Sequence, residues 1–164
     1  MNEVNEYGWS LSRLASDIEW PIVPVLAEME IAGIELDSKV LEEFGTRLEK
    51  RINQLKAEIF DLAGEEFNMG SPAQLGQILY GRLGLPTAGL KKGKTGVSTA
   101  ADVLEKLRGS HPIIPLIMEY RELDKLKNTY VDALPGLVKA DGRCHTSINQ
   151  TIAPTGRMRQ WKRN

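Results

Sequence analysis

The side chains best suited to chemistry in this sequence are cations, and one group of them lies between Glu119 and Tyr130. Arg121, Lys125 and Asn128 are spaced i, i+4 and i+7, so a helix with 3.6 residues per turn presents them on one face. Lys127 projects nearer the apolar side. A row of cations on a helix can bind a polyanion, and the alternative is an ordinary solvated polar face.

A second group of cations occupies residues 87–97, which read as a loop rich in lysine and glycine. Lys91, Lys92 and Lys94 lie on this loop, and Ser98 or Thr99 is expected to begin a short helix. Ammonium groups, hydroxyls and the free amides of a helix start suit a nucleic-acid backbone. The alternative is a solvated loop without a ligand.

The same loop fits a relaxed phosphate-binding motif, Ala88 to Thr95, with alanine at the first glycine position. That motif needs a buried strand before it and a helix that starts at its Lys-Thr pair. Residues 83–86 do not read as a strand, and the helix is expected to start three or four residues late. A nucleotide hydrolase is therefore disfavoured, and it predicts that Lys94→Ala abolishes nucleotide binding.

No reaction centre is evident from the remaining residue types. Asp132 and Asp141 stand apart in different elements, so they do not form a carboxylate pair for metal catalysis. The single cysteine, Cys144, excludes an internal disulfide, and with His111 and His145 it makes no zinc site. The sequence offers binding groups, and we predict no catalytic and no metal-ligating residue.

Charge and composition narrow the class of partner. The 164 residues have a net charge of -1, but residues 1–66 contain 15 acidic and 6 basic residues and residues 67–164 contain 7 and 15. The basic half is predicted to meet a polyanion, unless the two halves neutralise each other. No apolar run of about 18 residues is present, so no membrane span is expected. An acidic start and one cysteine fit a reducing cytoplasm.

Apolar periodicity predicts a mainly α fold. Helices are expected from residues 17–21 to Gly33, from Asp37 or Ser38 to Gly64, from Ser71 to Gly84, from Ser98 or Thr99 to Gly109, and from Pro112 to Pro135. The apolar stripe of the last helix is predicted to run through Tyr120, Leu123, Leu126 and Tyr130. After Asp141-Gly142 the pattern alternates, which predicts a strand through Cys144, Thr146, Ile148, Gln150 and Ile152.

Several short motifs, taken in order, carry a resemblance that covers about residues 19–157. They are Ile18-Glu19-Trp20-Pro21, Pro24 to Glu30, Gly33-Ile34, Phe67-Asn68, Ser71-Pro72, Gln74-Leu75, Lys94-Thr95-Gly96, Ser98-Thr99, Glu119-Tyr120-Arg121, Lys125-Leu126-Lys127, Thr129-Tyr130, His145-Thr146-Ser147, Asn149-Gln150 and Thr155-Gly156-Arg157. In this combination the chain resembles the family A DNA polymerases, the family of bacterial DNA polymerase I.

The resemblance implies an architecture of long antiparallel helices, like a polymerase thumb, with a short C-terminal β-strand or hairpin. It implies that residues 1–18 lead in from an upstream exonuclease-like domain and that residues 19–135 are the thumb. Residues 136–157 would then begin the palm, and residues 158–164 form an atypical basic tail. It also implies work in DNA replication and repair, in the cytoplasm at the bacterial nucleoid.

The resemblance further implies that primer–template duplex DNA is the partner. In the family, the thumb grips the DNA backbone and the minor-groove side, and an arginine matching Arg157 reads the primer-terminal base pair. The DNA-binding residues carried over to this sequence are Lys94, Ser98, Thr99, Arg121, Lys125, Lys127, Asn128, Thr129, Asn149, Gln150 and Arg157.

The sequence departs from the family after Arg157. The family continues with Leu-Ser-Ser, whereas this chain reads Met158 to Asn164 and stops, which is expected for a truncated or frameshifted end. The family's Mg²⁺-binding aspartates and fingers lie beyond this point, so this chain alone is expected to be an inactive nucleotidyltransferase, with the missing palm and fingers as partners. The alternative is a helical protein-interaction scaffold without a DNA role, which would use residues 42–58.

Overall fold

The computed structural model describes residues 10–93, 96–150, 152–153, 155 and 157–162. The chain divides into two compact units. We call Lys39–Asp132 the helical unit, and Met1–Ser38 together with Ala133–Asn164 the split unit. The predicted mainly α fold is confirmed, and the strands of the described residues are short and antiparallel.

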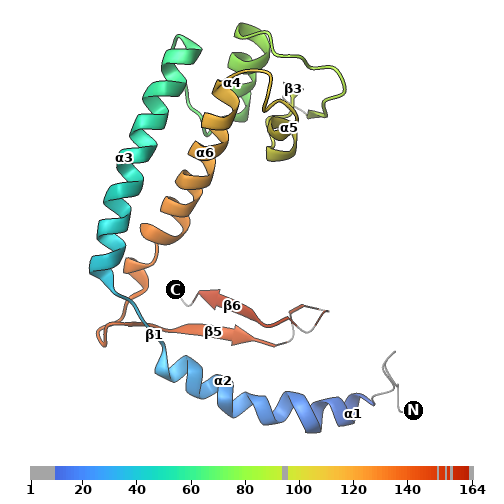
Figure 1. Cartoon of the computed structure of the whole chain (residues 1–164). Helices are drawn as coiled ribbons and strands as arrows, with labels where there is room; N and C mark the ends of the chain where they lie inside the picture. Colours follow the sequence, from blue (N-terminus) through green and yellow to red (C-terminus); the bar gives the residue numbers. More distant parts are fainter. Residues whose placement is uncertain (1–9, 94–95, 151, 154, 156, 163–164) are drawn as a thin grey trace. The chain divides into compact units, whose positions relative to one another are not determined.

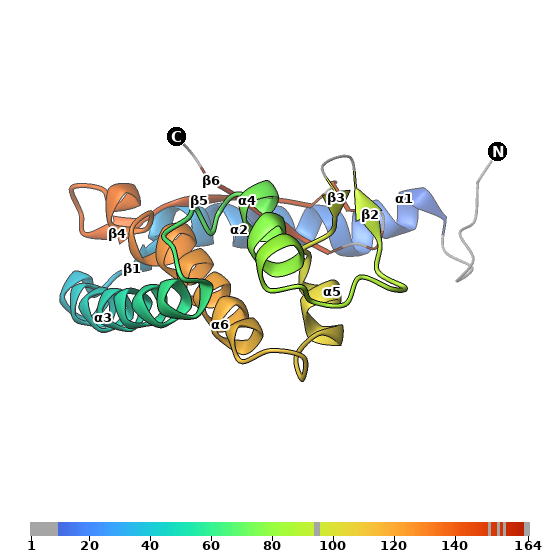
Figure 2. The same cartoon turned by 90° about the horizontal axis from the view of Figure 1, so that it is seen from above.

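Two long helices build the helical unit. Helix α3 (Ser38–Ala63) has 26 residues, and α6 (Ile113–Leu126) continues through a π-helical turn, η3 (Lys127–Val131). They run antiparallel and side by side (Figures 1 and 2). The three- and four-residue apolar spacing of α3 buries one stripe, and Gly64 (φ +73°) ends the helix, as predicted.

A shorter helical segment, α4 (Pro72–Gly76) with the π-helical η2 (Gln77–Arg82), follows the predicted start signal. The Ser71 hydroxyl accepts a hydrogen bond from the amide of Gln74 at 3.4 Å. The Gln74 side chain does not return this bond to Ser71. It accepts instead from the amide of Asn68, at 2.7 Å, so only one of the two hydrogen bonds of a capping box forms.

The lysine-rich segment contains a small hairpin, β2 (Lys92–Gly93) paired with β3 (Gly96–Val97), and α5 (Ala101–Lys106) follows it (Figure 2). The prediction that Ser98 or Thr99 begins this helix is wrong. Ala100 is the N-cap, because the Ser98 hydroxyl accepts from the Ala100 amide at 3.2 Å and Thr99 is held by another element.

One hydrophobic core fills the helical unit, between α3, α4, η2, α5 and α6. Its fully buried large side chains are Leu55, Ile59, Leu75, Leu79, Val103, Leu104, Ile113, Ile114 and Ile117. Burying this many branched aliphatic side chains is the main source of stability for such a unit.

The split unit begins with a continuous helical segment: α1 (Leu11–Leu14), the π-helical η1 (Ala15–Glu19) and α2 (Trp20–Ala32). The helix predicted to start at residues 17–21 is therefore continuous with helical structure in the lead-in residues from Leu11 onward. Pro21 lacks an N–H and its ring crowds the preceding turn, and the wider π-helical turn before it allows the helix to continue. None of the helices in the described ranges has the length and apolar content needed to cross a membrane.

Two strand pairs complete the split unit. Strand β1 (Ile34–Glu35) pairs with β4 (Arg143–Cys144), and β5 (Thr146–Asn149) pairs with β6 (Arg159–Lys162). The predicted C-terminal hairpin is confirmed, and part of the basic tail forms its second strand. The expected single strand from Cys144 is interrupted at His145. The last helix also ends at Val131, before the predicted Pro135, which begins a separate 3₁₀ turn, η4 (Pro135–Leu137).

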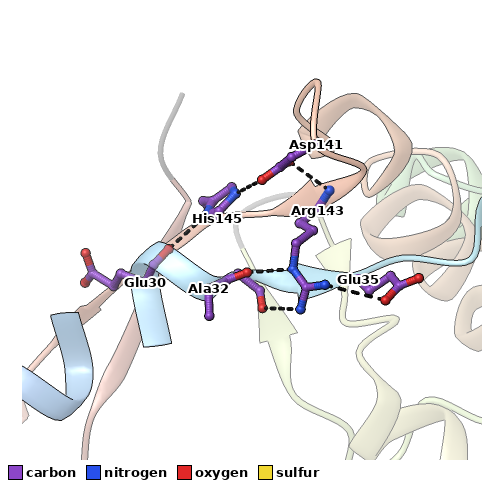
Figure 3. A network of polar contacts seen from close by, with 7 residues as sticks. Glu30, Ala32, Glu35, Asp141, Arg143 and His145 are labelled. Carbon is purple, nitrogen blue, oxygen red and sulfur yellow. Dashed lines mark hydrogen bonds and ion pairs between the residues drawn. The ribbon is translucent and has the colours of Figure 1, made fainter. Parts of the chain in front are cut away.

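Two side chains fasten the C-terminal end of α2 (Figure 3). Arg143 donates from Nε to the Ala32 carbonyl at 2.6 Å and from Nη2 to the Gly33 carbonyl at 3.2 Å. His145 lies with Nδ1 2.8 Å from the Glu30 carbonyl oxygen. Cations that satisfy the last carbonyls of a helix also complement its dipole, so this network fixes β4 and the start of β5 against α2.

Candidate nucleic-acid interface

The predicted cationic helix and the segment that follows the lysine-rich loop contact each other inside the helical unit. The guanidinium of Arg121, on α6, donates from Nη1 to the Thr99 carbonyl and from Nη2 to Thr99 Oγ1 at 3.4 Å. Thr99 is only 5% exposed, and Arg121 is half-buried. Burial lowers the pKa of Arg121 from its ordinary value, but an arginine remains charged at neutral pH.

A shallow pocket of about 310 Å³ opens at this contact. It is lined by the hairpin, the segment after it, the start of α4 and one side chain of α6: Pro72, Gly93, Gly96, Val97, Ser98, Thr99, Ala100 and Arg121. Most of this lining is backbone and small side chains. Arg121 is its cation, so the pocket can receive an anionic group close to the chain.

The Ser98 backbone is held by two further elements. The Tyr80 hydroxyl, on η2, donates to the Ser98 carbonyl at 2.8 Å, and burial raises the pKa of Tyr80. The Ser98 amide donates to the Lys91 carbonyl at 2.9 Å. The Lys91 ammonium pairs with Asp102 at 3.2 Å, which lowers the pKa of that carboxyl.

The other side chains of α6 and η3 that were predicted to bind DNA differ in whether they already have a protein partner. Lys125 is exposed and makes no ion pair with any described residue. Lys127 pairs with Asp132 at 2.8 Å, a hydrogen bond that raises the pKa of the ammonium group. Asn128 donates to Asp124 at 3.0 Å, and Thr129 is exposed.

The predicted apolar stripe is confirmed along α6 and fails at its end. Ile113, Ile114, Ile117 and Tyr120 are buried, whereas Tyr130, predicted to be on the apolar face, lies on η3 and is 52% exposed. Arg121 follows Ile114 by seven residues, so both project to nearly the same side. This spacing is the sequence signal that could have identified Arg121 as a flank of the buried face. Tyr80, which donates to the Ser98 carbonyl, has no comparable signal in the sequence.

Three predicted DNA contacts belong to the split unit. Asn149 is exposed at the end of β5, and Gln150 donates to the Glu19 carboxylate at 3.0 Å. Arg157 is exposed and lines an apolar pocket with α2 side chains. Lys94 lies outside the described residues.

The hairpin also bears on the nucleotide-hydrolase alternative. Strand β3 begins at Gly96, the residue after the motif, and α5 begins only at Ala101. A phosphate-binding loop of that class needs a helix that starts at its Lys-Thr pair, so the required geometry is not present. No group of three or more His, Cys, Asp or Glu side chains among the described residues is arranged to hold a metal ion.

Comparisons with known proteins agree on one family. The profile described as DNA polymerase family A matches residues 38–164. DNA polymerase I of Lactococcus lactis subsp. cremoris is 48% identical over 145 residues, which is 88% of this chain and 16% of that protein. The thermostable DNA polymerase I of Thermus thermophilus is 49% identical over 147 residues, 88% of this chain and 18% of that protein.

A solved structure agrees with them. The POL domain of Pol1 from M. smegmatis, in complex with DNA primer-template and dNTP, matches with a TM-score of 0.80 at 39% identity, over 90% of this chain and 26% of that chain. This chain thus spans less than a fifth of the curated relatives. Since the profile covers more than half of the residues, this chain belongs to DNA polymerase family A.

Proposed function

We propose that this chain is the duplex-DNA-binding thumb portion of a DNA-directed DNA polymerase. On this proposal, residues 19–135 are the thumb and residues 136–157 begin the palm. The observation that supports it most is the pocket at Thr99 and Arg121, in a chain whose structural relative from M. smegmatis is in complex with primer-template DNA.

The geometry of the helical unit suits a phosphate backbone. Lys92 and Lys125 are exposed, and Ser98 lies in the pocket between the hairpin and α5. Ammonium groups, a hydroxyl and backbone amides make contacts with phosphate oxygens that do not depend on base identity. We therefore expect duplex binding without sequence preference.

The other side chains predicted to contact DNA differ in whether they must first leave a partner within the protein. Lys127 has to leave Asp132, or bind phosphate while remaining paired with it. Asn128 likewise has to leave Asp124, or bind DNA while it keeps that hydrogen bond. Thr129 is exposed on the last turn before Val131. Lys94, Asn149, Gln150 and Arg157 complete the proposed set.

Salt dependence of binding tests the proposal. With about five cationic contacts, the affinity of the 164-residue chain for a primer–template duplex should fall with salt at a log–log slope of about -4 to -5. Lys125→Ala should weaken binding equally for duplexes of different sequence, and it should reduce the magnitude of the slope by about 0.9.

Lys50→Ala is the matched control, because Lys50 is an exposed lysine on α3 outside the proposed contact surface. It removes the same charge and should leave the affinity within about twofold of the unmodified chain. Equal effects of the two substitutions would attribute binding to net charge and remove the assigned surface. If neither the chain nor its variants bound duplex DNA, the scaffold alternative would take precedence.

A further inference from the structure

We infer that Arg121 is a positioning residue: it holds the Ser98–Thr99 segment in the form that receives the DNA backbone, rather than serving mainly as a charge on a phosphate. This inference rests on the proposed DNA-binding function and deepens it. It changes the role of a side chain that its position in the sequence would place among the direct contacts.

The first support is how the guanidinium is already used. Two of its nitrogens donate to the carbonyl and hydroxyl oxygens of Thr99. Thr99 is almost fully buried, so its polar atoms need protein partners. Breaking these bonds to free Arg121 for a phosphate would leave a buried carbonyl without a donor, which carries a desolvation cost.

The second support is that the segment is held at consecutive carbonyls. The Ser98 carbonyl accepts from the Tyr80 hydroxyl, and the Thr99 carbonyl accepts from Arg121. A carbonyl oxygen repels a phosphate oxygen, because both carry negative charge. Directing these two oxygens to donors on η2 and α6 removes that repulsion from the pocket, whatever other contacts the DNA makes.

The third support is the shape of the donor. A planar guanidinium can reach both oxygens of Thr99 at once, whereas an ammonium group is a point charge on a flexible stem. Arg121→Lys therefore keeps the charge and loses the two-point hold. Tyr80→Phe removes the other hold without changing any charge, since only the hydroxyl is lost.

The first measurement needs no DNA. Amide hydrogen exchange of Ser98, whose amide donates to the Lys91 carbonyl, reports whether the segment is fixed. We expect exchange to become about tenfold faster in Arg121→Lys and in Tyr80→Phe. Arg108→Ala, which removes an exposed arginine paired with Glu105 on α5, should leave it unchanged. Unchanged exchange in Arg121→Lys would overturn the inference.

The second measurement is duplex binding by the same variants. We expect Arg121→Lys and Tyr80→Phe each to weaken binding several-fold at an unchanged salt slope, and the double variant to be weakened by less than the product of the two effects. A direct phosphate contact predicts the reverse: no effect of Tyr80→Phe, and a slope reduced by about 0.9 in Arg121→Ala. That result would overturn the positioning role.

Failure of the proposed function gives a different result. If the unmodified chain bound no duplex, the DNA-binding proposal would fall and the use of the segment with it. If the chain bound duplex but Lys125→Ala had no effect, the assigned surface would fall. The exchange measurement would still report the hold of Arg121 on Thr99, so the two failures are distinguishable.

Discussion

Gly33 ends α2 with a backbone conformation that only glycine adopts easily, φ +62°. A Cβ atom at this position would lie 2.8 Å from His145 Cε1 and 2.9 Å from Nδ1. Gly33→Ala therefore combines backbone strain with a collision against the ring that caps α2. We expect it to lower the free energy of unfolding by more than the about 1–3 kcal/mol of backbone strain alone, as measured by urea denaturation.

Gly142→Ala separates these two causes. Gly142 has φ +78° and lies in the same unit, but a Cβ there would meet nothing within 4 Å. Gly142→Ala should therefore lower the free energy of unfolding by the cost of backbone strain alone. Equal losses of stability in the two variants would mean that the His145 ring moves away without cost.

The charge state of His145 predicts that the stability of the folded chain depends on pH. Nδ1 lies 2.8 Å from the Glu30 carbonyl and Nε2 lies 2.8 Å from the Asp141 carboxylate, so both nitrogens donate, as only the protonated ring can. The hydrogen bond to the Glu30 backbone, followed by that to Asp141, raises the pKa of His145 above its ordinary value of 6.5, and the charge of Arg143 opposes this.

The raised pKa fixes the sign of the effect. Protonated His145 stabilises the folded state fully below the unfolded pKa of 6.5, and this contribution is lost as the pH rises through the higher folded pKa. Unfolding by urea should therefore show a larger difference between the unmodified chain and His145→Gln at about pH 5.5 than at about pH 8.5. The Asp141 pKa is lowered from 3.8, so its own titration falls outside this window. A difference that does not change with pH would contradict the assignment of a charged ring.

At the scale of elements, α3 carries the core of the helical unit. Leu55 is fully buried, whereas Leu62, on the same helix, is 36% exposed. Leu55→Ala should cost about 2–5 kcal/mol of stability, because it leaves a cavity among packed side chains. Leu62→Ala removes the same atoms and should cost less than about 1.5 kcal/mol. Equal costs, measured by urea unfolding, would argue against this arrangement of the core.

The long helices were predictable because their apolar spacing extends over several turns. In α3, Leu48, Ile52, Leu55 and Ile59 repeat at three- and four-residue steps, and glycine marks the end. Short elements lack this redundancy. The two-residue strands β2 and β3 are too short for a period, and Ser98 carries the same capping signal whether it caps a helix or a turn. The hairpin and the true start of α5 were therefore missed.

The candidate site was predictable in residue type and less so in role. Arg121, Ser98 and Thr99 were selected together, and the structure brings them to one pocket. Their mutual hydrogen bonds could not be read from the chain, because 22 positions separate Thr99 from Arg121 and only tertiary packing joins them. The same holds for Tyr80, 18 positions before Ser98.

At the scale of the whole chain, buried apolar side chains are distributed unevenly. Among the residues whose side-chain burial the structure describes, which leaves out β6, Leu26 is the buried apolar side chain of the split unit, and the others belong to the helical unit. Helix α2 exposes Trp20 (68%) and Ile31 (77%), so much of its apolar surface stays in contact with water. Area buried sets most of the favourable free energy of folding, so the two units should differ in stability.

Native-state hydrogen exchange in rising urea measures that difference by segment. Amides of α3 and α6 should exchange only through global unfolding of the helical unit, with rates that rise steeply with urea. Amides of α2 should exchange through smaller openings that depend weakly on urea. The proposed contacts at Arg121 and Lys125 belong to the better-packed unit, so duplex binding should weaken but persist at urea concentrations where α2 has lost protection. Protection of α2 as strong as that of α3 would contradict the difference in stability, and loss of all binding together with α2 protection would mean that Asn149, Gln150 and Arg157 carry most of the affinity.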